Sequence, residues 1–187
     1  MRFFKQVKIV PVSDNMLEKA RIFSEEVLLT VGRQGRYKDT NQNDLAKNRQ
    51  DHYVGKVAEE AVRQIFQELD REVQGPDYKI YQGRGKSWDS DLYVDGVPLA
   101  VKAQTTEMAK KFGLSWTFQA SESRYDPILN KPNSWVCFVE FDQQNRQCYV
   151  YPPYQIQELT FAKPKLPKYW GTKLAVYRSS LPLFVSI

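Results

Sequence analysis

The residues of this 187-residue chain that could do chemistry together lie between positions 89 and 104. Lys102 and Gln104 belong to a strand-like run, and side chains alternate faces along a strand, so both point to the same side as Ala100. Three carboxylates precede the lysine: Asp89, Asp91 and Asp95. An acid that faces a lysine on an adjacent strand can hold a divalent cation and an activated water against a phosphodiester. The pattern therefore indicates phosphodiester hydrolysis.

A β-hairpin must position these residues. The dipeptide Asp95-Gly96 is typical of a two-residue hairpin turn, and short strand-like runs lie on both sides of it. Val97, Leu99 and Val101 are expected to point to the face opposite Lys102. Position 100 lies two residues before the lysine, where a second carboxylate would complete a metal site, and it is an alanine.

The segment Asp91-Leu-Tyr-Val-Asp-Gly-Val-Pro-Leu-Ala-Val-Lys102 resembles the core of the PD-(D/E)xK nuclease superfamily. In that pattern, a strand that begins with Asp turns through a short hairpin into a strand that ends in (Asp/Glu)-x-Lys. The match covers the hairpin and both ends of the segment, with Ser90 in place of the optional proline, and it departs from the pattern at Ala100. The resemblance implies an α/β fold with a restriction-endonuclease-like core, in which helices flank a mixed central sheet.

The resemblance also implies roles for individual residues. Asp91 would be the central ligand of Mg²⁺, for which Mn²⁺ could substitute, and the Val101 carbonyl and Glu59 would be further ligands. Lys102 would position the attacking water or lower its pKa, and Gln104 would orient water or a phosphate.

The alanine at position 100 removes one anionic ligand, so metal affinity and cleavage are expected to fall. Three origins are open: an inactivating substitution made to trap a DNA complex, a natural pseudonuclease, or a site that takes its acid from Asp89 or Asp95. We favour the first, because every other element of the strand is intact.

The clearest helix of the sequence follows His52, which is expected to lie just before it. Its apolar residues recur at helical spacing: Val54, Val57, Ala58, Ala61, Val62, Ile65, Phe66 and Leu69. At about 100° per residue, Glu59 lies at the margin of this apolar face and Glu60 points to solvent. The resemblance places a helix glutamate near the metal, which favours Glu59; the alternative is that both glutamates only solubilise the helix.

The remaining elements extend this picture. A strand or extended arm is expected over 6–12, a helix from 13 to about 30, and a segment at 114–121 that is either a strand or the start of a helix. Further strands are expected at 78–82, 90–95, 98–104, 134–141 and 147–151. The core of the superfamily has this order of elements: a helix comes first, the hairpin strands follow, and further strands come last.

Three basic segments could follow a phosphate backbone: 32–49, 84–86 and 163–173. The candidate nucleic-acid contacts in them are Arg33, Arg36, Lys38, Arg84, Lys86, Lys163 and Lys165. An alternative interpretation is equally open for each segment. The first two could be ordinary solvated surface, and the third could be an irregular tail whose aromatic residues pack on the domain.

Composition suits a polyanionic partner, with 27 Lys and Arg against 22 Asp and Glu and a formal net charge of +5. The length predicts one domain, divided into an N-terminal helix and basic loop (1–50), a catalytic core (51–152) and a C-terminal extension (153–187). Cys137 and Cys148 are expected to be buried, reduced thiols in a cytoplasmic protein without a leader or membrane span.

The function expected from these observations is metal-dependent endonuclease cleavage of double-stranded DNA, of restriction or homing type, with Ala100 inactivating this chain. Cleavage of both strands implies a homodimer or higher homo-oligomer, because one such site hydrolyses one phosphodiester at a time. Three alternatives are a non-catalytic, sequence-specific DNA-binding protein, a DNA-repair or junction nuclease, and a structural or subunit-interface protein. The sequence does not decide between DNA and RNA.

Overall fold

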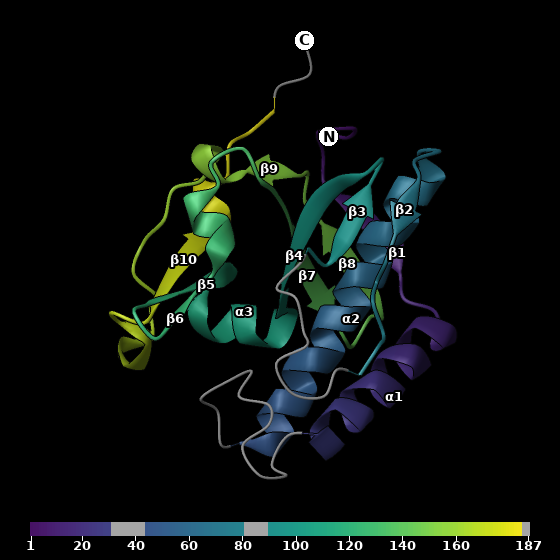
Figure 1. Ribbon diagram of the computed structural model, residues 1–187, viewed down its shortest axis with the longest axis horizontal. Helices are drawn as coiled ribbons and strands as arrows, with labels where there is room; N and C mark the ends of the chain where they lie inside the picture. The colour runs from purple at the N-terminus through teal and green to yellow at the C-terminus, as the bar shows by residue number, and fades with distance from the viewer. Residues whose placement is uncertain (31–43, 81–89, 185–187) are drawn as a thin grey trace.

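A mixed sheet forms the centre of the computed structural model, which describes residues 1–30, 44–80 and 90–184 (Figure 1). The strand order is β1-β8-β7-β4-β3-β2, and β9 pairs with β7. The bounds are β1 (Lys8–Pro11), β2 (Val73–Gln74), β3 (Leu92–Val94), β4 (Val97–Thr105), β7 (Trp135–Asp142), β8 (Gln147–Val150) and β9 (Tyr154–Gln155). Strands β4 and β7 run parallel, whereas the other pairs are antiparallel.

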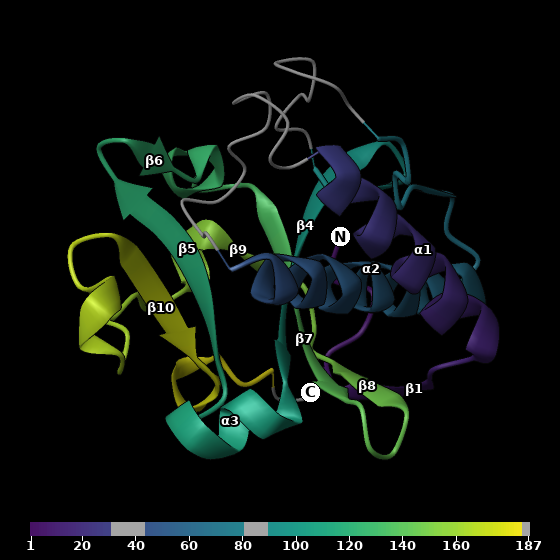
Figure 2. The same cartoon turned by 90° about the horizontal axis from the view of Figure 1, so that it is seen from below.

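Two helices cover one face of this central sheet, α1 (Asp14–Thr30) and α2 (Leu45–Glu68). Helix α2 lies directly on the sheet and α1 packs on the outer side of α2 (Figure 2). Val57, Ala58 and Ala61 of α2 are fully buried in the core beneath it. The predicted apolar face of this helix is therefore its contact with the sheet.

A second, three-stranded sheet covers the other face (Figure 2). This small sheet has the order β10-β5-β6 and consists of β5 (Ser115–Ser121), β6 (Arg124–Tyr125) and β10 (Lys173–Tyr177). The Trp116 ring stacks on Phe138 of β7 at 4.6 Å between centroids, and its indole nitrogen donates a hydrogen bond to the carbonyl of Val139. The expectation that helices flank the sheet thus holds for one face and is wrong for the other.

The small sheet settles the open assignment of 114–121 as a strand. Trp116 and Phe118 are buried and alternate with partly exposed residues, which is the period of a strand with one face in a core. Between β4 and β5 lies α3 (Thr106–Phe112), which is capped by the Thr105 side chain. Short 3-10 turns complete the chain: Pro127–Asn130, Ile156–Glu158, Pro167–Tyr169 and Arg178–Ser180.

Helix α2 begins earlier than the sequence predicted. The Asp44 side chain accepts a hydrogen bond from the Lys47 backbone and caps the first turn, and a Lys47–Asp51 ion pair supports the next. His52 is consequently a helical residue, whose ring meets Phe23 of α1 edge-on. The expected division at residue 50 falls inside α2.

The expected strand at 78–82 is also absent where the structure describes it, because residues 78–80 are not part of a strand. The strand that pairs with β3 is the two-residue β2, and at Gly75 the backbone adopts a φ of +95° that turns the chain away. The tail after 161 differs from the expected irregular segment too, because it contributes β10 to the small sheet.

Two other expectations concern whole-chain properties. Cys137 and Cys148 are free and buried, as predicted. Within residues 1–30, 44–80 and 90–184, no helix is long and apolar enough to cross a membrane.

Candidate functional site

The predicted hairpin is present and orients the site residues. Asp95 and Gly96 have φ values of 48° and 74°, the left-handed conformation that a two-residue hairpin turn requires. Leu92 pairs with Leu99, and both are fully buried on the side of α2. Ala100 packs instead against the apolar cluster beneath the small sheet. The predicted alternation of faces along β4 is therefore correct.

Asp91 lies directly before β3 and binds the neighbouring strand through its side chain. Its Oδ2 atom accepts a hydrogen bond of 2.7 Å from the backbone amide of Val101. Because the N–H and C=O of one strand residue point to the same edge, the Val101 carbonyl faces the edge that Asp91 occupies. The structure thus brings the Asp91 side chain against the backbone of Val101.

Lys102 reaches across to the small sheet. Its ammonium lies 2.8 Å from Oδ2 of Asp126 and 4.9 Å from the centroid of the Phe118 ring. The same Asp126 oxygen accepts a hydrogen bond from the backbone amide of Gln119. Lys102 is therefore held by the carboxylate of Asp126, which the sequence pattern did not indicate.

The contact of Asp126 with Lys102 could not be recognised from the sequence. Asp126 precedes Pro127 at the start of a 3-10 turn, where an aspartate is ordinarily a capping residue. Its side chain makes no capping hydrogen bond there and binds Lys102 instead. From the sequence alone, Asp126 was indistinguishable from a cap.

Gln104 connects the central sheet to β5. Its Oε1 atom accepts a hydrogen bond of 2.8 Å from the backbone amide of Ser115, the first residue of β5. The side-chain oxygen of Gln104 is thus engaged in the fold, and among the described residues its amide nitrogen is the part that remains for orienting a ligand.

The two helix glutamates are both buried, with exposed fractions of 8% for Glu59 and 7% for Glu60. Glu59 lies 2.6 Å from the ammonium of Lys56. Glu60 accepts a 3.0 Å hydrogen bond from the Tyr78 hydroxyl, and burial together with this carboxylate raises the pKa of Tyr78 above its ordinary range. The expectation that Glu60 faces solvent is wrong, because α1 and the chain at Tyr78 cover that side of α2.

The metal-binding arrangement is incomplete in the residues that the structure describes. The Asp91 carboxylate lies at the edge of β4, where it accepts a hydrogen bond from the Val101 amide. No group of three or more His, Cys, Asp and Glu side chains among the described residues could hold a metal ion. Mg²⁺ prefers six oxygen ligands, several of them water, held by one or two carboxylates. Among the described residues, the structure therefore shows no assembled magnesium site.

The two alternative acids differ in position. Asp95 lies in the hairpin turn, where it accepts a hydrogen bond from the Glu72 amide and lies 3.5 Å from Arg71. These contacts hold Asp95 at the turn. Asp89 lies outside the described residues.

The candidate nucleic-acid contacts are only partly described. Arg33, Arg36, Lys38, Arg84 and Lys86 lie outside the described residues. Lys163 is exposed, and its ammonium lies 5.7 Å from the centroid of the Trp170 ring. The Lys165 ammonium lies beside Gly113, at the C-terminal end of α3, where a cation interacts favourably with the helix dipole.

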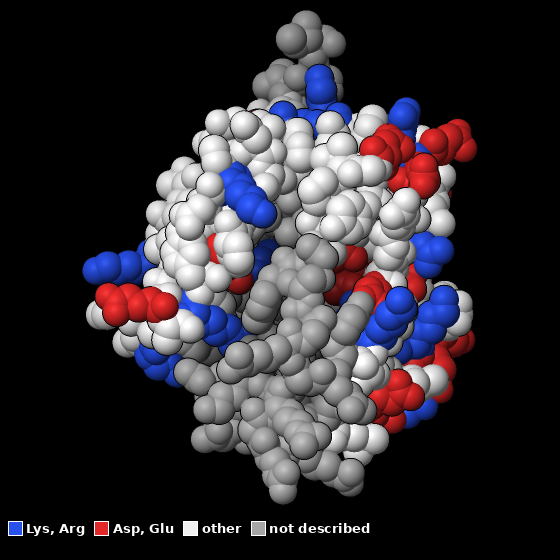
Figure 3. Space-filling view, viewed as in Figure 1, with Lys and Arg blue, Asp and Glu red and all other residues white. Residues whose placement is uncertain are grey.

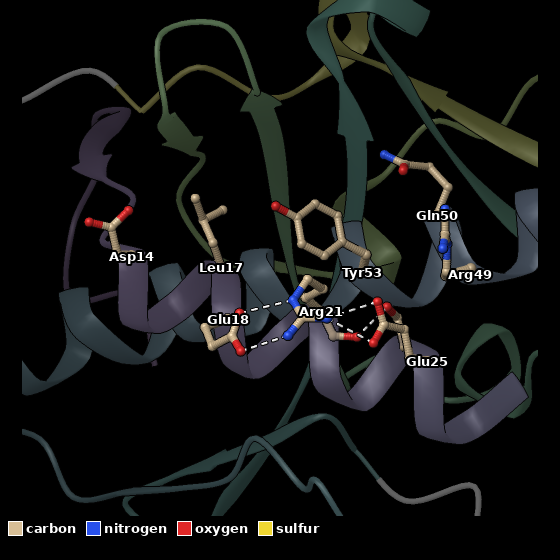
Figure 4. A pocket seen from close by; sticks show the side chains of 9 residues that line it. Asp14, Leu17, Glu18, Arg21, Glu25, Arg49, Gln50 and Tyr53 are labelled. Carbon is tan, nitrogen blue, oxygen red and sulfur yellow. Dashed lines mark hydrogen bonds and ion pairs between the residues drawn. The ribbon is translucent and has the colours of Figure 1, made fainter. Parts of the chain in front are cut away.

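A groove of about 610 Å³ lies between α1 and α2 (Figure 4). Its central charged residue, Arg21, donates hydrogen bonds to both Glu18 and Glu25 on α1. In this groove, the charges of Arg21, Glu18 and Glu25 therefore satisfy one another.

Comparisons of the chain with protein-family models, with curated proteins and with solved structures found no match. The contacts of Asp91, Lys102 and their neighbours are therefore the basis for a function.

Proposed function

We propose that this chain carries the site of a Mg²⁺-dependent endonuclease that cleaves duplex DNA, of restriction or homing type, and that Ala100 leaves the site one acid short. The observation that carries the proposal is the hydrogen bond from the Val101 amide to the Asp91 carboxylate, on the same strand as Lys102. The order of α2, the β3–β4 hairpin and then the further strands β7 and β8 also agrees with the order that the resemblance implies.

Position 100 is where an added acid would meet Asp91. Leu92 pairs with Leu99 in an antiparallel register, so the next pair along sets Asp91 opposite residue 100. Side chains directly opposite each other have Cβ atoms roughly 5 Å apart, close enough for two carboxylates to share one cation. A bound Mg²⁺ would supply neutralisation of the charge that builds on the phosphate.

Lys102 is the residue of the described site that can act on water. Its ammonium donates to Asp126, which fixes its position, and an ammonium has three donors, so others remain for a water or a phosphate oxygen. Gln104, on the same face, retains its amide nitrogen as a donor.

The decisive experiment restores the acid. We expect Ala100→Asp or Ala100→Glu to cleave plasmid DNA or a defined duplex in the presence of Mg²⁺, and a further Asp91→Asn change to abolish that cleavage. Val97→Glu is the matched control, because it adds an acid on β4 at a position that faces the opposite side. The nuclease proposal fails if both position-100 variants fold, bind nucleic acid and remain inert on duplex DNA, single strands, junctions and RNA.

A second candidate is DNA binding without cleavage, favoured by the existing Lys102–Asp126 ion pair and by the missing acid. It predicts that the restored variants bind DNA and leave it intact. Cleavage of junctions but not of simple duplexes would instead identify a repair nuclease. For cleavage of both strands, the proposal includes a second copy of the chain that brings a second site.

A further inference from the structure

The last 29 residues of the chain, 159–187, contain no Asp or Glu, although the whole chain has 22. They contain five cations: Lys163, Lys165, Lys168, Lys173 and Arg178. The first three of these lysines are exposed, and in the described parts of the chain none of the three forms an ion pair. Figure 3 shows Lys and Arg side chains on the half of the molecule that the small sheet forms. An anionic partner would therefore meet lysines whose charge no described carboxylate neutralises.

Two aromatic residues lie among these lysines, Tyr169 and Trp170. The Lys163 ammonium lies 5.7 Å from the centroid of the Trp170 ring. The ammonium groups of Lys168 and Lys173 lie 5.1 and 4.3 Å from the centroid of the Tyr169 ring. Because the two rings belong to neighbouring residues, these contacts join all five residues. We call Lys163, Lys168, Tyr169, Trp170 and Lys173 the Trp170 surface.

Trp170 exposes the apolar part of its side chain and conceals the polar atom. The residue is 55% exposed, whereas its indole nitrogen donates a 2.8 Å hydrogen bond to the Pro164 carbonyl. A tryptophan at a protein surface ordinarily buries its ring and leaves the nitrogen in contact with water. Within residues 162–172, Trp170 is the only exposed large apolar residue. The exposed part of this ring is therefore suited to stacking on another planar group.

The turn that carries Trp170 is held in place by its own hydrogen bonds. At its base, the backbones of Ala162 and Ala175 exchange two hydrogen bonds of 2.8 Å. The Tyr177 hydroxyl donates a further hydrogen bond of 3.0 Å to the Lys163 carbonyl. Figure 2 shows this turn on the outer side of β10, away from α1 and α2. A surface that is formed in advance loses less conformational entropy when it binds a partner.

We propose that the Trp170 surface binds a single strand of nucleic acid, with an unpaired base stacked on Trp170 and the adjacent phosphates at Lys163 and Lys168. Proteins that bind single strands combine cations along the backbone with aromatic rings on which bases stack. The bases of a duplex are stacked on one another, so they cannot cover an exposed ring. The arrangement therefore favours a single strand over a duplex.

The inference rests on the proposed function in one respect, because it takes the anionic partner to be nucleic acid. The Trp170 surface lies outside the site of β4, and binding there requires neither a metal ion nor an acid at position 100. A membrane of anionic lipids also attracts lysines and tryptophan. We favour nucleic acid because a single exposed ring suits the stacking of one base better than insertion into a bilayer.

The first experiment compares a single strand with a duplex. A labelled oligodeoxythymidine and a labelled duplex of the same length are titrated with the full chain in EDTA, so that no cleavage interferes. Since one stacked base contributes a factor of about ten to affinity, we expect Trp170→Ala to weaken single-strand binding about tenfold and to leave duplex binding unchanged. Trp170→Phe keeps a ring and should retain most of the affinity. The matched control is Tyr125→Ala, because Tyr125 is an aromatic residue of the same small sheet with an exposed fraction of 44%.

The second experiment tests the phosphate contacts, and it also applies if Trp170→Ala does not fold. The affinity for the oligodeoxythymidine is measured at several KCl concentrations. Loss of one phosphate contact lowers the slope of log affinity against log salt by about 0.7 for a single strand. We expect this change for Lys163→Gln and for Lys168→Gln, and none for Lys8→Gln, which removes an exposed charge on β1.

The outcomes separate the inference from the function. If Trp170→Ala binds the single strand as tightly as Tyr125→Ala does, the inference is wrong, even where a position-100 variant cleaves DNA. An equal loss of duplex affinity also overturns it, because Trp170 would then contact the backbone instead of a base. Binding of anionic lipid vesicles through Trp170, without binding of the oligonucleotide, would identify a membrane surface instead. If Trp170→Ala weakens only single-strand binding and the salt slopes change as expected, the inference stands, even where no position-100 variant cleaves.

Discussion

Replacing Glu59 by Gln tests whether this glutamate stabilises the fold, apart from any role in the candidate site. The Lys56 ammonium and the Glu59 carboxylate are 2.6 Å apart, and their side chains are only 11% and 10% exposed. The substitution keeps the shape of the side chain and removes its charge, so a buried ammonium loses its counter-ion. We expect a clear loss of stability that a merely solvent-facing glutamate would not produce.

The size of this loss of stability follows from the burial of the ion pair and from the aromatic rings that stay in contact with Lys56. Breaking a buried ion pair from one side costs about 3–5 kcal/mol. The ammonium would still lie over the rings of Phe23, at 4.8 Å, and Tyr78, at 5.4 Å, and such contacts return about 1 kcal/mol. We therefore expect the free energy of unfolding to fall by about 2–4 kcal/mol.

Urea unfolding followed by circular dichroism measures this change. The matched control is Glu107→Gln, because the Glu107–Lys111 pair has the same 2.6 Å separation on α3 and is exposed, so its loss should leave the unfolding curve unchanged. The double variant Lys56→Met with Glu59→Leu should recover most of the stability, because apolar residues can replace a buried pair. The reasoning is refuted if Glu59→Gln unfolds at the same urea concentration as Glu107→Gln.

The remaining predictions concern Gly75 and Tyr78. Gly75→Ala should destabilise the protein more than Gly171→Ala in urea unfolding, since both glycines have positive φ but only at Gly75 would a Cβ lie 2.8 Å from the Asp91 carbonyl oxygen; equal midpoints would contradict this. For Tyr78, burial and Glu60 raise the pKa, so the phenol stays protonated in the folded protein at a pH where it ionises in the unfolded chain. The stability that Tyr78 contributes is therefore fully present below its ordinary pKa of 10 and is lost as the pH rises above that value. Stability should accordingly fall above pH 10 more steeply in the wild type than in Tyr78→Phe, and parallel curves for the two proteins would show that Tyr78 is not the cause.

The sequence predicted those parts of the site that depend on local signals. The Asp95-Gly96 turn and the alternation along β4 need only neighbouring residues, and they place Ala100 and Lys102 on one face. The hydrogen bond between Asp91 and the Val101 amide was not predicted, although the same hairpin positions it. Each of these features is encoded within a few positions of the chain.

The features that the sequence missed depend on segments that are distant in the chain. Glu60 is buried because α1 and Tyr78 cover α2, and a helical projection of α2 alone contains neither. Asp126 reaches Lys102 only because β5 and β6 fold back over the central sheet. The strand β10 is recognisable as such only beside β5, its partner in the small sheet.

The pairing of β5 with β10 has implications for how the chain folds during synthesis. Strand β5 emerges from the ribosome long before β10, since the strands β7, β8 and β9 come between them. During that interval β5 has an unpaired edge, and Trp116 lacks its later partner Val176. Unpaired edges and exposed apolar residues favour aggregation of partly folded chains. The nascent chain would therefore be most vulnerable late in translation, when the central sheet can already form but the small sheet cannot yet close.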